Sequence, residues 1–268
     1  MKSFLRVAWW PAAVGFLACI LMTLTAVNAA SQQPNNGSVI KLPDKDRTML
    51  TQILGEGVVG KAVPAQTISN PLTFFPLRNG TWTYRMTSGK NKGATVDHVL
   101  SELKRDAPGT RWQEALGGNL ALFLLKSENG SVETVSTHDQ KQGVISRYSP
   151  REPFLIADMR PGASKRLTSA VKVYDLSHPD HLTHSGSLDI TYSYVGVYEV
   201  TVPAGTFKAS LFKWQYEGKV GPAKVQDIQY RFYAENVGTV AMIEKTDVSA
   251  LLVYQQHTKI GKVLIKHP

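Results

Sequence analysis

Three histidines and two aspartates lie close together in a short polar stretch, at His178, His181 and His184 with Asp175 and Asp180. Neutral imidazole and carboxylate groups bind zinc, and three such ligands with a water molecule form a catalytic site. The rest of the stretch consists of ordinary loop residues, and a flexible loop seldom holds metal-ligand geometry unaided. We therefore expect a solvated loop and no cofactor, and a metal-assisted hydrolase is the last of three functional alternatives.

Motifs of other catalytic classes are incomplete. Ser210–Lys213 has Ser-x-x-Lys spacing, but it falls on an expected strand, where residues three apart point to opposite faces. Gly55–Lys61 matches most of a phosphate-binding loop, yet Ala62 replaces the required Ser or Thr and no strand–helix alternation follows. The chain also has no Gly-x-Ser-x-Gly nucleophile motif. The sequence therefore predicts a protein that is not an enzyme.

Large aromatic side chains recur at alternate positions along several expected strands. Rings with this spacing mostly fill a core, although a barrel too wide for its side chains leaves some of them lining a cavity. We predict a ligand-binding cleft lined by eight of them: Trp82, Tyr84, Tyr194, Tyr198, Phe212, Trp214, Tyr230 and Phe232.

Positive charge gathers in the C-terminal third, at Lys208, Lys213, Lys219, Lys224, Lys259, Lys262 and Lys266. These lysines either provide solubility and protect edge strands, or form a basic rim for an anionic headgroup above the aromatic cleft. The formal net charge of +9 falls to +7 when Lys2 and Arg6 are removed with a signal peptide. This charge favours a lipid headgroup or contact with a membrane surface, and we expect no nucleic-acid partner for an exported protein.

The central stretch of the sheet is expected to be a β-hairpin. Its first strand is Tyr192–Val202, followed by Pro203-Ala204-Gly205 and a second strand from Thr206. Tyr192, Tyr194, Tyr198, Val200 and Val202 share one parity, and a period of two indicates one buried face. Proline suits the first central position of a type I turn, and glycine adopts positive φ easily. The turn therefore fixes the register of the two strands.

The second strand changes parity part of the way along. Phe207, Ala209 and Leu211 share one parity, whereas Phe212 and Trp214 have the other. Either a bulge near Leu211 shifts the register, or the strand is apolar on both faces and lines a cleft as well as the core.

Short alternating segments continue from Phe74 to the end of the chain, with Asn129-Gly130 as a hairpin turn. Few helical patterns interrupt them, so we predict an all-β fold, an antiparallel curved sheet or half-open barrel, in one domain. The other expected strands include Thr95–Leu103, Arg111–Leu116, Leu120–Lys126, Val132–Thr137, Gly143–Tyr148, Val171–Leu176, Thr239–Thr246, Leu251–His257 and Ile260–Lys266, with a loop at His178–Ser187.

The N-terminal residues resemble an export signal. Lys2 and Arg6 precede the apolar run Val7–Val27, and small residues follow it, so residues 1–29 are predicted to be a cleaved signal peptide. An uncleaved membrane anchor is the alternative. Residues 30–72 are predicted to be a linker with a short helix, Asp44–Leu54, capped by Asp44 and ended by Gly55, and residues 73–268 are the β domain. The mature protein, periplasmic or secreted, has no cysteine because Cys19 lies in the signal peptide.

Three segments resemble a family of secreted bacterial β-proteins of unassigned function. They are Phe75–Tyr84, with its PL-x-x-G start and following aromatic residues, Val202–Ala209, with VPAGTF, and Phe232–Val240, with YA-x-x-x-G-x-V. The family is similar in shape to half-open periplasmic lipoprotein carriers, which hold acyl chains. The resemblance implies a fold and no catalytic residues. The Trp82 spacing from Gly80 is shorter than the family pattern.

These observations favour an exported, non-catalytic binding protein that holds an amphiphilic or apolar ligand, such as a lipid, in a curved-sheet cleft. The alternative is an envelope protein–protein interaction module that has no ligand pocket. The two differ in whether the aromatic face is an open cleft or a filled core.

Overall fold

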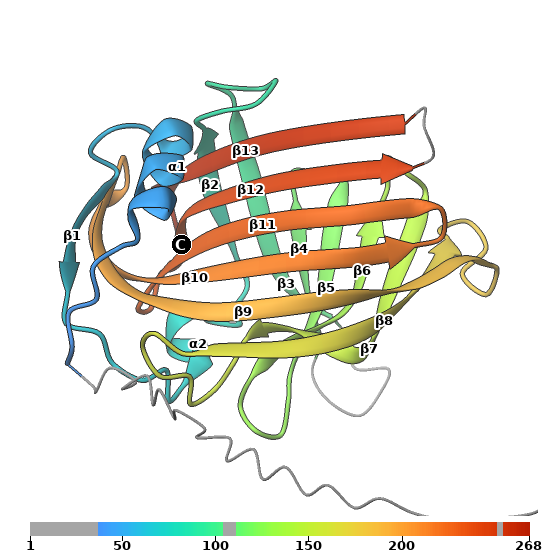
Figure 1. Ribbon diagram of the computed structural model, residues 1–268, viewed down its shortest axis with the longest axis horizontal. Helices are drawn as coiled ribbons and strands as arrows, with labels where there is room; N and C mark the ends of the chain where they lie inside the picture. Colours follow the sequence, from blue (N-terminus) through green and yellow to red (C-terminus); the bar gives the residue numbers. More distant parts are fainter. Residues whose placement is uncertain (1–36, 104–110, 251–253) are drawn as a thin grey trace, which may run out of the picture. The chain divides into compact units, whose positions relative to one another are not determined.

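Antiparallel strands form most of the structure, a computed structural model that describes residues 37–103, 111–250 and 254–268 (Figure 1). The predicted signal peptide lies outside the described residues. Within this part of the chain there are two helices, α1 (Asp44–Leu54) and α2 (Pro71–Phe74), and thirteen strands. The strands are β1 (Val59–Val63), β2 (Gly80–Met86), β3 (Thr95–Leu103), β4 (Arg111–Leu116), β5 (Leu120–Lys126), β6 (Val132–Asp139), β7 (Val144–Leu155), β8 (Ser164–Asp175), β9 (Leu182–Val202), β10 (Gly205–Val220), β11 (Ala223–Ala234), β12 (Gly238–Ala250) and β13 (Tyr254–Lys266).

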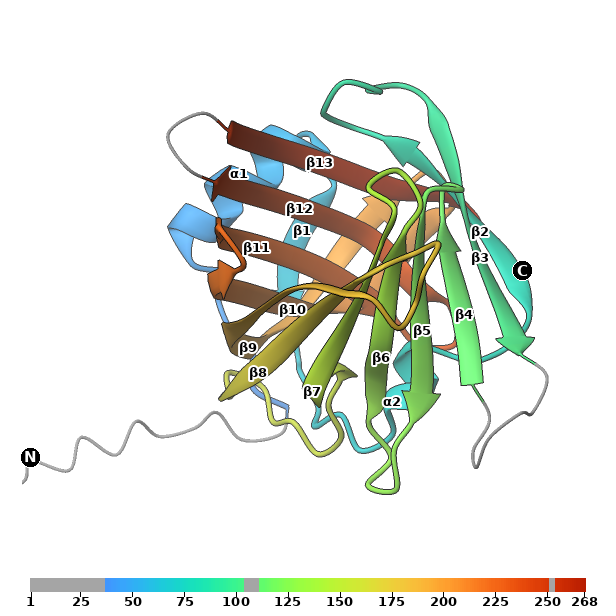
Figure 2. The same cartoon turned by 90° about the vertical axis from the view of Figure 1, so that its right-hand side faces the viewer.

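The sheet closes on itself. From β2 to β13 each strand pairs with the next in the chain, and β13 returns to pair with β2, so twelve strands make an up-and-down barrel. Figure 2 shows β3–β8 facing the viewer, with β9–β13 behind them. The predicted all-β antiparallel fold is confirmed, and closure leaves β1 as the one strand outside the ring among the described residues.

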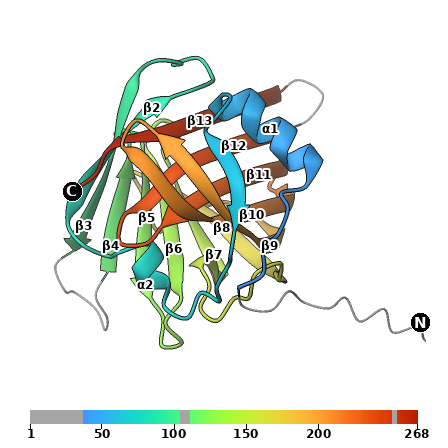
Figure 3. The same ribbon diagram turned by 90° about the vertical axis from the view of Figure 1, so that its left-hand side faces the viewer.

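The β9–β10 hairpin extends beyond the ring at one end of the barrel. The first part of β9 pairs with β8 as far as Ser193, and its later part pairs instead with β1, where Val59 lies opposite Val200. On the other side, pairing between β10 and β11 begins only at Ala209. Residues Gly205–Lys208 are therefore held by β9 alone and form an overhang at this end (Figure 3).

A bulge lies opposite Leu211, but its extra residue is in β9 and not in the second strand, whose register was predicted to shift. Leu211 is opposite Gly196 and Phe212 is opposite Tyr194, which leaves Val195 without a cross-strand partner. Because side chains alternate, one extra residue exchanges the faces of all that follow. The expectation that the β9 aromatics share one face is therefore wrong. Tyr194 and Tyr198 lie on opposite faces.

Strand β10 itself is continuous and is buried on both faces, which agrees with the second alternative. Leu211 and Phe212 are both 0% exposed. Phe212 stacks on Tyr194 with ring centroids 4.8 Å apart, whereas Lys213, on the same face as Leu211, binds Asp46 of α1 at 2.9 Å. Helix α1 lies across the outside of the barrel wall (Figure 3), so the second buried face is covered by a helix and is no cleft.

Helix α1 has the predicted bounds, but its N-terminus differs from the prediction. Pro43 occupies the cap position without a side-chain hydrogen bond, and Asp44 is the first helical residue. Gly55, with φ of 110°, ends the helix as expected. Strand β1 and helix α1 both pack against the barrel although they lie in the stretch predicted to be a linker.

The bounds of β3, β4 and β5 agree with the predictions, whereas β6, β7, β8 and β12 are longer than predicted, and β9 and β13 differ further. Strand β9 begins at Leu182, inside the stretch His178–Ser187 expected to be a loop, because its first residues pair with β8. Strand β13 is continuous from Tyr254 to Lys266 where two strands were expected. The start of the predicted strand Leu251–His257 lies outside the described residues.

Asp46 is predicted to hold α1 on the barrel. Its carboxylate accepts hydrogen bonds from Lys213 at 2.9 Å and from the Tyr230 hydroxyl at 2.7 Å, and it is 5% exposed. Asp46→Asn leaves the ammonium of Lys213 without its counter-charge and should lower the free energy of unfolding by about 1.5–3 kcal/mol.

Urea denaturation measures this loss, and Asp44→Asn is the matched control. The Asp44–Lys41 pair is more than 80% exposed on both side chains, so its removal should leave stability unchanged. Equal effects of the two substitutions would show that α1 is not anchored through Asp46.

Candidate functional site

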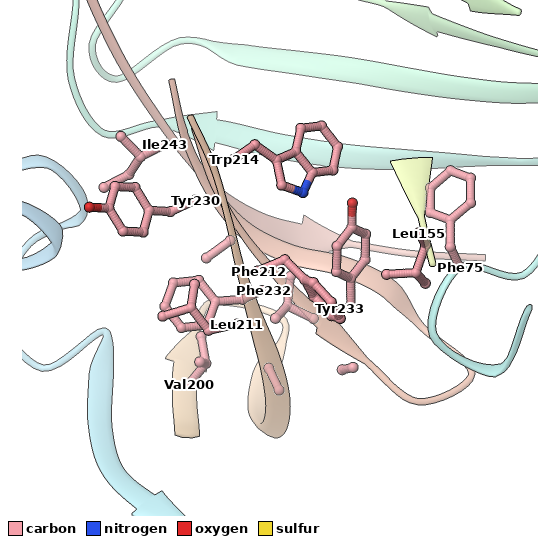
Figure 4. Packing of buried hydrophobic residues seen from close by; sticks show 14 of the residues in the cluster. Phe75, Leu155, Val200, Leu211, Phe212, Trp214, Tyr230, Phe232, Tyr233 and Ile243 are labelled. Carbon is pink, nitrogen blue, oxygen red and sulfur yellow. The ribbon is translucent and has the colours of Figure 1, made fainter. Parts of the chain in front are cut away.

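The middle of the barrel is filled by packed rings. Phe154 lies 4.7 Å from Phe75 and 5.6 Å from Trp214 between ring centroids, and Tyr192 stacks on Trp214 at 5.2 Å. Figure 4 shows Phe212, Trp214 and Tyr233, from β10 and β11, together with Phe75 from the segment that follows α2. We call this group the aromatic plug: Phe75, Phe154, Tyr192, Phe212, Trp214 and Tyr233.

A guanidinium group packs against the plug. The guanidinium carbon of Arg231 lies 4.2 Å from the ring centre of Trp214 and 4.9 Å from that of Phe154. The group donates a hydrogen bond to Gln229 Oε1 at 3.1 Å and forms no ion pair with a described carboxylate. Arginine is always charged, so a fixed positive charge stands inside the barrel beside the rings.

Two hollows lie on either side of the plug. The inward-facing residues of β10, followed along the strand, line first one hollow, then the plug, then the other hollow. Ser210 lines the first hollow, Phe212 belongs to the plug, and Trp214 and Tyr216 line the second. The first hollow opens at the β9–β10 overhang, and we call it the rim groove. The second is lined by residues of β4–β7 and β9–β12, and we call it the lumen cavity.

The rim groove has a volume of about 470 Å³ and a mainly apolar lining. Its floor includes Phe74, Val197 and the ring of Tyr194, and its other lining residues are Pro64, Gln66, Thr206, Phe207, Lys208, Ser210, Ala234 and Glu235. The Tyr194 hydroxyl donates to the Gln66 carbonyl at 3.0 Å, which fixes the ring against the groove wall. Burial raises the pKa of this phenol to about 12, so it stays a neutral donor.

The edge of the rim groove carries one cation that has no ion-pair partner among the described residues. Lys208 is exposed on the overhang, and Glu199, its cross-strand neighbour, lies 3.2 Å from Lys61 instead. Glu235 lines another part of the edge. The groove therefore combines an apolar floor with a charged mouth.

The lumen cavity is smaller, about 210 Å³, and a larger share of its lining is polar. Leu116, Leu120 and Leu122 form one wall, and charged side chains from β7, β11 and β12 form the other: Glu152, Asp227, Arg231 and Glu244. Leucine side chains and carboxylates thus face each other across a narrow space.

The carboxylates of the lumen cavity are bound by neutral donors. Asp227 accepts hydrogen bonds from Thr246 at 2.7 Å and from Gln229 at 2.6 Å, and Glu152 accepts one from Tyr216. Burial, together with the charge of Glu244, raises the pKa of Asp227 to about 6. Burial also raises the pKa of Glu152.

A separate buried chain links β3, β4 and β13. The Lys262 ammonium lies 3.0 Å from His98 Nε2, and His98 Nδ1 lies 3.3 Å from a carboxylate oxygen of Glu114. Because an ammonium can only donate, Nε2 is the acceptor and the proton of the neutral ring is on Nδ1. Burial lowers the pKa of His98 despite the nearby carboxylate, which keeps the ring neutral. This chain binds the buried Oε1 of Glu114, whereas Oε2 of the same carboxylate has no hydrogen-bond partner among the described residues.

The structure does not bring the eight predicted site residues together. Tyr194 lines the rim groove, Trp214 borders the lumen cavity, and Phe212 is inside the plug. Trp82 and Tyr84 are buried and donate to the carbonyls of Val237 and Thr239 at 2.6 and 2.8 Å. A role in ligand binding stays a prediction for these five.

The other three predicted residues belong to the outer layer beneath α1. Tyr230 donates to Asp46, Phe232 is on the same face of β11, and Tyr198 lies beyond the bulge near Arg47. All three are 0% exposed.

Sequence reasoning missed the charged residues of the lumen cavity. On β11, Asp227, Gln229 and Arg231 alternate with apolar residues, a pattern that is typical of a solvated face. They face inward because α1 covers the apolar face of this strand. The available signal was that the alternating polar residues of β11 lie next to β10, a strand that is apolar on both faces.

The histidine stretch does not form a metal site in the structure. His178 lies 3.7 Å from Asp175 with both side chains exposed, and no group of three or more potential ligands is placed to hold a metal ion in the described ranges. In those ranges, too, no helix is long and apolar enough to span a membrane.

Two solved structures are similar to this chain. One is a protein from Bacteroides fragilis NCTC 9343, assigned as exported, with a YmcC-like fold; identity is 13%, the TM-score is 0.38, and 76% of this chain and 99% of that chain are covered. The other is a protein from Parabacteroides distasonis ATCC 8503, assigned as a lipoprotein, at 15% identity and a TM-score of 0.33, with 73% and 99% covered. Likenesses this weak carry no inference about the function of this chain. The chain matches no protein-family model and no curated protein.

The pH dependence of stability tests the burial of Asp227. Because the fold raises this pKa from 3.8 to about 6, the ionised carboxylate costs stability above pH 6, and the cost disappears as the pH falls toward 4. Asp227→Asn removes this cost. The variant should therefore be more stable relative to the native chain at pH 7 than at pH 4.5, by about 2 kcal/mol.

Urea unfolding at the two pH values gives this difference, and Asp189→Asn, on the exposed face of β9, controls for the loss of one charge. If the difference between the Asp227 variant and the native chain is the same at both pH values, Asp227 is solvated and does not line a buried cavity.

Proposed function

We propose that this chain is an exported, non-catalytic binding protein that holds an amphiphilic ligand in the rim groove. The observation that carries the proposal is a groove of about 470 Å³ whose floor is apolar and whose edge presents an unpaired lysine among the described residues. Ligand sites typically range from about 300 to 1,000 Å³, so the rim groove fits this class and the lumen cavity is below it. Export follows from the predicted signal peptide.

The floor of the groove suits a hydrocarbon chain. Phe74, Val197 and the Tyr194 ring supply contact surface, and each buried CH₂ group contributes about 0.8 kcal/mol. Because the aromatic plug occupies the middle of the barrel, we place the hydrocarbon chain of the ligand at the end of the barrel, under the β9–β10 overhang. The sequence had instead predicted a ligand cleft lined by the aromatic residues of several strands.

The mouth of the groove suits a polar headgroup. The ammonium of Lys208 is exposed and makes no ion pair with a described residue, since the carboxylate opposite it lies against Lys61. An anionic group on the ligand can therefore pair with Lys208 without breaking an existing contact. The exposed position limits this gain to about 0.2–1 kcal/mol.

The competing function, a protein-docking face without a pocket, has less support. Large exposed apolar side chains in the described ranges are limited to Val39, Val99 and Leu182, on separate segments. Docking faces usually present a contiguous apolar patch, whereas single exposed residues are ordinary.

Phe74→Glu should abolish binding of dodecanoate, because it places a charge on the apolar floor. Isothermal titration calorimetry measures the affinity, and Phe123→Glu is the matched control. Both phenylalanines are half-buried, but Phe123 contacts His138 and lies outside the groove. Retained binding in the Phe74 variant, or equal losses in both, would place the ligand elsewhere.

Lys208→Gln should weaken dodecanoate binding by about two- to five-fold, the range expected for an exposed charge pair. It should leave the affinity for dodecanol, which has no charge, unchanged. Lys224→Gln, another exposed lysine, controls for net charge. A Lys208 variant that loses affinity for both ligands equally would mean that the lysine acts through packing and not through its charge.

A further inference from the structure

The lumen cavity contains charges of both signs that are not paired with each other. Arg231 donates to the amide oxygen of Gln229 and lies over two rings, while Asp227 and Glu152 accept hydrogen bonds from neutral groups. No described residue forms an ion pair with any of these three side chains within 4.0 Å. Asp227 is buried, and Arg231 and Glu152 are half-buried. Charges withdrawn from water are normally paired, because leaving water carries a cost.

Another donor lines the same cavity. Trp214 is 2% exposed, and its indole N–H has no hydrogen-bond partner among the described residues. The Arg231 guanidinium lies over the face of this ring, and its fork of N–H donors matches the two oxygens of a carboxylate. The acceptors Asp227 and Glu152 match an ammonium group.

We propose that the lumen cavity binds a small zwitterion, a free amino acid with an apolar side chain. Its carboxylate pairs with Arg231 and its ammonium group with Asp227 and Glu152. The leucine wall contacts its side chain. Each buried charge then gains a charge-assisted hydrogen bond that the neutral partners do not provide.

Size and access agree with this class. A volume of 210 Å³ corresponds to about seven water-sized groups, since one water occupies about 30 Å³ of the liquid. This space accepts an amino acid such as leucine and excludes a long acyl chain. The side chain of Glu244 is exposed and Leu120 is half-buried, so these two residues mark the open side of the cavity.

Three ligands of one carbon skeleton test the charges. L-Leucine carries both groups, 3-methylbutylamine carries the ammonium alone, and 4-methylpentanoate carries the carboxylate alone. Isothermal titration calorimetry on the native chain should show binding of leucine and at least ten-fold weaker binding of the other two. No heat with leucine at millimolar concentration, or equal affinities for all three ligands, would overturn the proposal.

Variants locate the site. Asp227→Asn should weaken leucine binding at least ten-fold, and Leu120→Trp should block it by filling the open side, whereas Asp189→Asn on the outer face should leave it unchanged. Circular dichroism checks that each variant folds. Arg231 is left intact because its guanidinium packs against the plug.

The rim-groove variant makes this test independent of the proposed function. Phe74→Glu should leave leucine binding unchanged, because the plug separates the two hollows. Loss of leucine binding in this variant, or full binding in both lumen variants, would show that leucine binds outside the lumen cavity and would contradict the assignment.

Discussion

The packed rings in the middle of the barrel determine where a ligand can bind inside this fold. A barrel of twelve strands is wider than one that ordinary aliphatic side chains fill. Phe154 fills the middle of the barrel from one wall. Its ring centroid lies 4.7 Å from that of Phe75 and 6.3 Å from that of Tyr233, and the guanidinium carbon of Arg231 lies 4.9 Å from it. The rim groove and the lumen cavity lie on either side of these rings, and the two differ. The rim groove is mainly apolar with a charged mouth, and the lumen cavity has charged side chains of both signs in its lining.

One extra residue in β9 makes this arrangement compatible with a second apolar layer. Because Val195 has no partner across the strand pair, Tyr194 faces the barrel while Tyr198 faces outward. The outward aromatics need a cover, which α1 provides through Asp46. As a consequence, the polar parity of β11 points into the barrel, where Asp227 and Arg231 become functional candidates.

Local sequence patterns were enough for the fold class and for some of the elements. Alternation predicted β3, β4 and β5 with their bounds, and the change of parity near Leu211 indicated the strand that is buried on both faces. Closure of the barrel could not be predicted, because the pairing of Lys262 with Met86 joins strands far apart in the chain. Alternation also says which residues share a face but not which face is inside. The predicted aromatic site was therefore divided between the plug, the two hollows and the layer beneath α1.

The central claim is that an amphiphile binds at the end of the barrel and not through its filled middle. A crystal structure with 12-bromododecanoate tests it directly, since anomalous scattering locates the bromine. The account predicts the carboxylate at Lys208 and the bromine on the floor of the rim groove near Phe74 and Val197. A bromine in the middle of the barrel, with the rings of Phe154 and Trp214 displaced, would contradict it.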